Sequence, residues 1–204
     1  MNKKISMIAS FANAAAVLSF AVSMIFGNFY TSCLSSTFIA FSFVAMICAY
    51  TFYSKQEMKL AGIISIGFAV MYANLISIVY FAQITTIQRG GLSVQATNIL
   101  DYQKFGLFFN YNMLGYALMA LSTFFAGLTI NNVRSKGDKW LKALLLIHGI
   151  FFIFCFILPM LNLLTPDMGG YELIGTAVLE FWCIYFLQIS ILSFLYFSKV
   201  KEEP

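Results

Sequence analysis

Charged residues are scarce in this 204-residue sequence, which has 12 Lys or Arg and 8 Asp or Glu. They make up 10% of the chain, against roughly 25% in soluble proteins, whereas 61% of the residues are hydrophobic. A water-soluble fold and a disordered chain are therefore excluded. Membrane topology explains the net charge of +4, so no nucleic-acid partner is expected. The composition predicts an integral membrane protein with the lipid bilayer as its first partner.

Residues typical of metal and redox sites are also rare, with one His and four Cys that form no Cys-x-x-Cys pair. A single His excludes zinc sites that need two, and no metal site is expected. The cysteines lie far apart and three of them fall at membrane depth, so a redox role lacks its usual signature. No Gly-rich phosphate loop is present. The residues therefore indicate no particular cofactor and favour a protein that is not an enzyme.

Long apolar runs are what the sequence does contain. About 20 apolar residues suffice for a helix to cross a hydrocarbon core of about 30 Å. The runs predict an all-α, polytopic membrane protein with six transmembrane helices in a single bundle, forming one domain over residues 1–204. The predicted spans lie at about 5–26, 34–53, 60–82, 107–130, 141–164 and 173–197.

The basic residues predict how these spans are oriented. Positive charge accumulates in short cytoplasmic segments next to span ends. If the N-terminus is cytoplasmic, ten basic residues face inward, whereas only Arg89 and Lys104 face outward. The inward set is Lys3, Lys4, Lys55, Lys59, Arg134, Lys136, Lys139, Lys142, Lys199 and Lys201. The expectation is a multi-pass protein of the cell membrane with both termini cytoplasmic.

The long outer loop, residues 83–106, has a pattern of its own. Apolar residues recur at helical spacing after Ser93, whose hydroxyl is placed to cap a helix. A short helix lying at the membrane interface is expected here. Shielding the top of the bundle is the favoured role, and a gate is the alternative.

Glu180 is the one acidic residue well inside a predicted span, about eight residues into the sixth. A central charge costs about 2.5 to 3.5 kcal/mol on insertion scales, so the side chain is expected to face the bundle interior. Two interpretations stay open. The carboxyl is either a protonated hydrogen-bonding group between helices or part of a ligand, ion or proton site.

His148, the only histidine, lies about eight residues into the fifth span. Counting 1.5 Å per residue leaves about 6 Å between its depth and that of Glu180, so the two could pair and relay a proton. The favoured interpretation is a buried histidine hydrogen-bonded to a Ser or Thr. Ligation of a haem iron by His148 is a weaker alternative.

Polar residues of the outer half form the last candidate site. Asn74, Asn112 and Tyr116 lie at comparable depth on the third and fourth spans, and Asn110 points away from Asn112 on its helix. With Glu180 as counter-charge and His148 beneath it, they could line a pocket below the outer loop. The alternative is that these residues hydrogen-bond one another and leave no cavity.

Two function classes follow. The first is a membrane protein that binds or transports a small amphipathic molecule in the outer-half pocket, a cation if Glu180 is ionised and a neutral molecule if it is protonated. The alternative is a small intramembrane enzyme or an accessory subunit, in which faces rich in Gly, Ala and Ser pack against a membrane partner or a second copy of the chain.

Overall fold

The computed structural model describes residues 1–131, 133, 135–161 and 171–200, and these residues form helices and no strand. Six helical segments are long and apolar enough to cross a membrane. The main helices are α1 (Asn2–Ile25), α2 (Phe29–Phe52), α3 (Lys59–Thr85), α4 (Val94–Leu100), α5 (Leu107–Thr129), α6 (Lys136–His148), α7 (Phe151–Met160) and α8 (Tyr171–Ser198).

These segments coincide with the six apolar runs, and the differences lie at their ends. The second begins at Phe29 instead of residue 34, because Asn28 accepts a hydrogen bond from the Thr31 amide at 3.1 Å and caps the helix. The fifth begins at Lys136, where Ser135 and Asp138 form a capping box. Its predicted end, at 162–164, lies outside the described residues.

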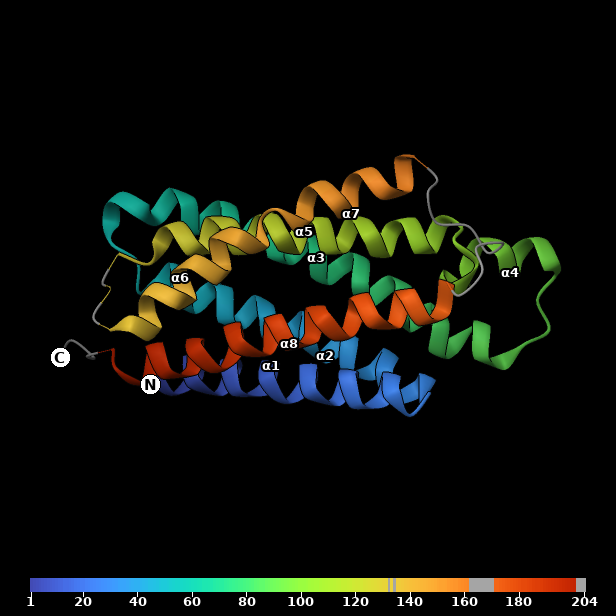
Figure 1. Cartoon of the computed structure of the whole chain (residues 1–204), viewed down its shortest axis with the longest axis horizontal. Coiled ribbons are helices and arrows are strands. Elements are labelled where there is room, and N and C mark those ends of the chain that lie inside the picture. The colour runs from blue at the N-terminus through green and yellow to red at the C-terminus, as the bar shows by residue number, and fades with distance from the viewer. Residues whose placement is uncertain (132, 134, 162–170, 201–204) are drawn as a thin grey trace.

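The helices lie side by side along the long axis of the molecule, with the start of α1 and the end of α8 at the same end of it (Figure 1). We call this the terminal end, and the end that holds α4 the loop end. α1 packs on α2, α2 on α3, and α3 on α5. α5 packs on both α6 and α7. α6 packs on α8, and α8 packs on α1. The order of packing therefore closes a ring.

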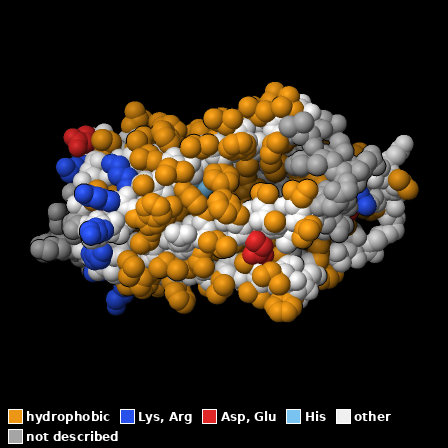
Figure 2. Space-filling view, in the orientation of Figure 1, with side chains coloured by type: hydrophobic (Ala, Val, Ile, Leu, Met, Phe, Trp, Pro, Cys, Tyr) orange, Lys and Arg blue, Asp and Glu red, His pale blue; other side chains and the backbone are white. Residues whose placement is uncertain are grey.

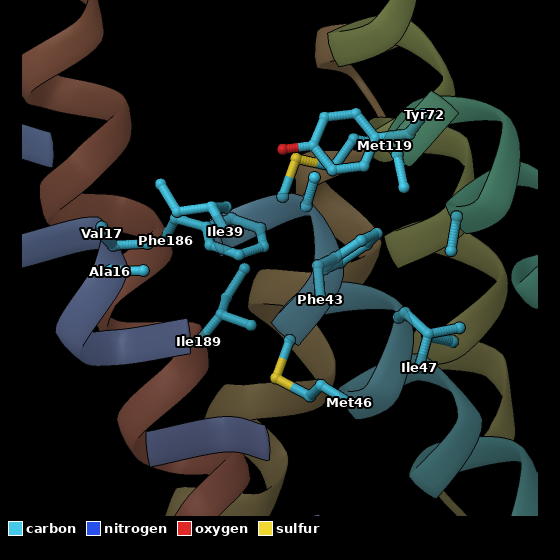
Figure 3. Packing of buried hydrophobic residues seen from close by; sticks show 14 of the residues in the cluster. Ala16, Val17, Ile39, Phe43, Met46, Ile47, Tyr72, Met119, Phe186 and Ile189 are labelled. Atoms are coloured by element: carbon cyan, nitrogen blue, oxygen red, sulfur yellow. The ribbon is translucent and has the colours of Figure 1, made fainter. Parts of the chain in front are cut away.

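The core lies where α1, α2, α3, α5 and α8 meet (Figure 3). Phe43 of α2 is fully buried, and its ring contacts Tyr72 at a centroid distance of 5.5 Å and Phe186 at 5.8 Å. Met119 and Ile189 pack around the same ring (Figure 3). Close packing of these large side chains fixes how α3 and α8 sit against α2.

Hydrogen bonds between helices cross the middle and the terminal-end half. Asn13 of α1 donates to the Ile39 carbonyl at 3.1 Å and to Ser42 Oγ at 2.9 Å, and it accepts from Ser190 of α8 at 2.8 Å. Each of Ser65 and Ser122 donates to the backbone carbonyl of the other, at 2.7 and 2.8 Å. Such bonds hold helices together where lipid supplies no alternative partner.

The fifth span, Lys136–Met160, contains a turn that the sequence did not predict. Between α6 and α7 the amides of Gly149, Ile150, Phe152 and Ile153 each bond to the carbonyl three residues earlier, at 3.0–3.1 Å. This is a 3₁₀ turn, which narrows the helix while keeping its backbone hydrogen-bonded. A Cβ on Gly149 would lie 2.9 Å from Phe124 Cβ, so the chain passes close to α5 at this turn.

The segment between α3 and α5 contains the expected short helix, α4. Ser93 caps it by accepting from the Ala96 amide at 3.2 Å. Gln83 Nε2, at the end of α3, donates to the Leu100 carbonyl at 2.8 Å and ties α4 back to the loop end. The ring of Tyr102 stacks on Phe29 at 6.2 Å, so this segment covers the loop ends of α2 and α3.

Candidate functional site

A polar cluster lies below this loop, where α2, α3 and α5 meet. The hydroxyl of Tyr80 approaches the side chains of Ser36, Asn112 and Tyr116. The approaches fall short of direct hydrogen bonds, because Ser36 Oγ and Asn112 Oδ1 have no hydrogen-bond partner among the described residues. Asn112 is only 8% exposed. The structure therefore brings together two of the predicted site residues, Asn112 and Tyr116, around a tyrosine.

Tyr102 closes this cluster from the loop. Its ring packs edge-on against Tyr80 at 5.6 Å, and burial raises its pKa well above the usual value. The phenol therefore stays neutral at physiological pH, as suits a side chain between two aromatic rings.

Asn74 does not belong to this cluster. It lies on an exposed face of α3, two residues from the fully buried Tyr72. Residues two apart point in different directions on a helix, so the packing of Tyr72 into the core turns Asn74 outward. The expected single pocket of Asn74, Asn112, Tyr116 and Glu180 is therefore not formed.

His148 is buried, with 1% of its surface exposed, at the start of the 3₁₀ turn. Trp182 Nε1 donates to His148 Nε2 at 3.1 Å, so that nitrogen carries no proton. The other nitrogen, Nδ1, lies 2.8 Å from Thr123 Oγ1, which in turn donates to the Ala120 carbonyl at 2.8 Å. Nδ1 is therefore the donor, and the ring is neutral.

This arrangement matches the interpretation of a buried histidine hydrogen-bonded to a Thr. Both ring nitrogens are occupied, which leaves neither of them free to pair with Glu180 or to bind a haem iron. Rings of Phe151, Tyr185 and Phe186 surround the imidazole at 5.2–5.7 Å. The geometry is that of a group that joins α5, α6 and α8.

Aromatic contacts connect the polar cluster to His148. Tyr116 packs edge-on against Trp182 at 5.5 Å, and Trp182 bonds to His148. Sequence reasoning missed Trp182, although its position two residues after Glu180 placed it at the same depth as His148. It also missed Thr123, which stands among many similar Ser and Thr residues.

Glu180 does not belong to the buried core, contrary to expectation. The residue is partly exposed on α8, and its Oε1 atom is shielded without a hydrogen-bond partner in the described chain. The interior side of α8 at this level is formed by Trp182 and Cys183, which are both buried. Glu180 therefore lies beside the core, and Oε1 has no partner within the part of the chain that the structure describes.

A groove of about 270 Å³ opens in the loop-end half between α5 and α7. Its lining is mainly apolar, with one amide. The residues are Asn110, Leu114, Cys155, Phe156, Pro159 and Met160. The groove lies on a different helix face from the pocket that the sequence predicted: Asn110 contributes to the groove, whereas Asn112 points into the core.

The described cysteines are all free, and no group of three or more His, Cys, Asp or Glu in the described ranges could hold a metal ion. Comparison of the chain with protein-family models, curated proteins and solved structures gave no match.

Proposed function

We propose that the chain is a multi-pass membrane protein of the cell membrane, inserted as a single bundle with its terminal end in the cytoplasm. Lys and Arg side chains gather at the terminal end, and apolar side chains cover the flank between the two ends (Figure 2). This distribution supports the positive-inside orientation. A Cys placed at Lys136 should resist an impermeant maleimide added to intact cells, and one placed at Arg89 should react. The reverse pattern would refute the orientation.

Within this frame, we propose that the protein binds a small amphipathic molecule that enters from the outer leaflet. The groove between α5 and α7 is the observation that carries the proposal. It begins near Asn110, about 5 Å from the loop end of α5, and continues past Leu114 toward the membrane centre. The polar end of a guest would meet the Asn110 amide and its apolar part would contact Leu114 and Phe156.

The size and lining of the groove restrict the guest. The groove measures about 270 Å³. This is below the roughly 300 to 1,000 Å³ of pockets for drug-sized ligands, which favours a short chain or the end of a longer one. Because the described lining of the groove holds no carboxylate, a neutral polar group suits it better than the cation considered from sequence.

Cys155 provides a direct test, because its thiol lies in the groove. A short-chain monoacylglycerol should slow the reaction of Cys155 with a membrane-permeant maleimide in vesicles. Cys48, exposed on α2 in the terminal-end half, is the internal control and should react at an unchanged rate. A decyltrimethylammonium ion should protect Cys155 less well than the neutral amphiphile.

Filling the groove with a larger side chain provides a second test, for which a matched control variant exists. Leu114→Trp should abolish the protection of Cys155, whereas Leu18→Trp, on the exposed side of α1, should leave it intact. The proposal fails if no amphiphile protects Cys155, or if protection survives in Leu114→Trp.

A further inference from the structure

The loop-end third of α8 differs from the rest of that helix. From Trp182 onward buried residues recur at helical spacing: Trp182, Cys183, Phe186, Ile189, Ser190, Ser193 and Phe197. Between Leu173 and Phe181 no residue is buried. This stretch therefore presents a surface that the described part of the chain does not cover.

The carboxyl of Glu180 lies on this uncovered stretch of α8. Leu173, Thr176, Ala177 and Glu180 follow the spacing i, i+3, i+4, i+7, which places them on one helix face. Within the described residues the carboxyl has no ion pair, and Oε1 has no hydrogen-bond donor. His148, the nearest candidate in depth, uses both ring nitrogens elsewhere.

Lipid tails cannot satisfy this carboxyl. Glu180 lies seven residues from Leu173, or about 10 Å along the helix from the loop end, and a charge at the membrane centre costs about 2.5 to 3.5 kcal/mol. Acidic side chains within membranes normally pair with a basic side chain or a hydrogen-bond donor. Among the described residues no donor to Glu180 Oε1 is present, which leaves this face open to a second molecule that supplies one.

We propose that this face of α8 docks a transmembrane helix of another protein, which carries a Lys or Arg at the depth of Glu180. Charge complementarity favours this partner, because a Lys or Arg on a transmembrane helix matches the Glu180 carboxyl in charge and is held at a fixed depth. Ala177 and Thr176 are small and lie one turn from Glu180, which allows a second backbone to approach closely. A Cβ added at Gly175 would meet nothing within 4 Å, so the neighbouring surface is open as well.

A second copy of this chain is a poorer partner. At the depth of Glu180 it would present the same carboxyl, because the spans hold no Lys or Arg near their centres. Two carboxylates in contact repel each other, and they could share a contact only if protonated. The proposal therefore specifies a different protein.

The experiment uses the full chain in phosphatidylcholine vesicles with a designed transmembrane peptide of Leu and Ala. One peptide carries a single Lys about 10 Å from its outer end, a second has Leu in its place, and a third has the Lys at the same distance from the inner end. Binding is measured by energy transfer between labelled peptide and protein. The Lys peptide should bind at least about tenfold more tightly than the other two.

Two variants separate charge from shape. Glu180→Gln keeps the size of the side chain and should remove the preference for the Lys peptide. Ala177→Leu keeps the carboxyl and should weaken binding by blocking close approach. Gln188→Leu, at an exposed position in the terminal-end half of α8, is the control and should bind like the native chain.

Equal binding of the three peptides to the native chain would overturn the proposal, as would unchanged Lys-peptide binding by Glu180→Gln. Energy transfer between two labelled copies of the chain that disappears in Glu180→Gln would overturn it in favour of a homo-oligomer. Decyltrimethylammonium binding that requires Glu180, without peptide binding, would overturn it in favour of a small cation. None of these outcomes bears on the groove, since Cys155 protection is measured without a peptide.

Discussion

The hydrogen-bond chain through His148 predicts that Thr123→Val destabilises the protein more than its small change in shape implies. Valine matches the size of threonine but cannot accept from Nδ1. The ring cannot adapt by moving its proton to Nε2, because Trp182 Nε1 already points a hydrogen at that atom from 3.1 Å. The Nδ1 donor is therefore left without a partner in a residue that is only 1% exposed.

The expected magnitude follows from this orphaned donor. Hydrogen bonds between membrane helices average about 0.6 kcal/mol in double-mutant cycles, because the unfolded chain finds other partners in the membrane. A buried group left unsatisfied costs about 1 to 3 kcal/mol. Since the ring cannot reorient, we expect the second mechanism to dominate and the free energy of unfolding to fall by about 1 to 2 kcal/mol.

The assay is unfolding by SDS in mixed micelles, followed by Trp fluorescence. Thr37→Val is the matched control, because Thr37 donates only to the Cys33 carbonyl of its own helix at 3.1 Å. Trp182→Phe should also lower the free energy of unfolding, because His148 Nε2 loses the donor that it accepts from. Equal losses in Thr123→Val and Thr37→Val would refute the reasoning.

Three further predictions concern the contacts that hold the fold. Gly149→Ala should lower the free energy of unfolding by about 1 to 3 kcal/mol, because its Cβ would lie 2.9 Å from an α5 side chain at the 3₁₀ turn. Asn13→Leu should cost about 2 kcal/mol in the same SDS assay, because three hydrogen bonds to α2 and α8 are lost. Gly106→Ala should speed protease cleavage within residues 83–106 from the outside, because the added Cβ would come within 2.0 Å of the Asn98 carbonyl oxygen and displace α4.

Each of the three has a control. Gly67→Ala has no neighbour within 4 Å of the added Cβ and should be neutral or stabilising by up to about 1 kcal/mol. Gln188→Leu removes an exposed amide and should cost far less than Asn13→Leu. The Gly67 variant should also leave cleavage of the 83–106 segment at the native rate. A loss of stability in the Gly67 variant as large as that in the Gly149 variant would contradict the steric argument.

Helix positions were predictable from sequence because long apolar runs and their polar boundaries are a strong signal. The capped short helix after Ser93 was predictable for the same reason, since the capping residue and the apolar spacing agree. The short 3₁₀ turn was not, because a single glycine such as Gly149 is common inside membrane helices and marks no boundary by itself.

The candidate site was less predictable, because the sequence does not determine how each helix is rotated about its own axis. Core-facing and lipid-facing residues are both apolar in a membrane protein, so the sequence does not reveal which side of a helix faces inward. Packing decides it, as when the burial of Tyr72 turns Asn74 outward. The same ambiguity hid which of Asn110 and Asn112 enters the core and whether Glu180 does.

The 3₁₀ turn at Gly149 also affects how the loop-end part of the fifth span, α7, can rotate. Beyond the turn α7 is ten residues long, or about 15 Å, and none of its side chains is buried. If α7 rotates as a rigid helix by about 10° at the turn, its far end moves by about 2.6 Å. A change in the angle at the turn would therefore change the width of the groove between α5 and α7. Under the proposed function, the torsional stiffness at Gly149 would help to decide which guests fit.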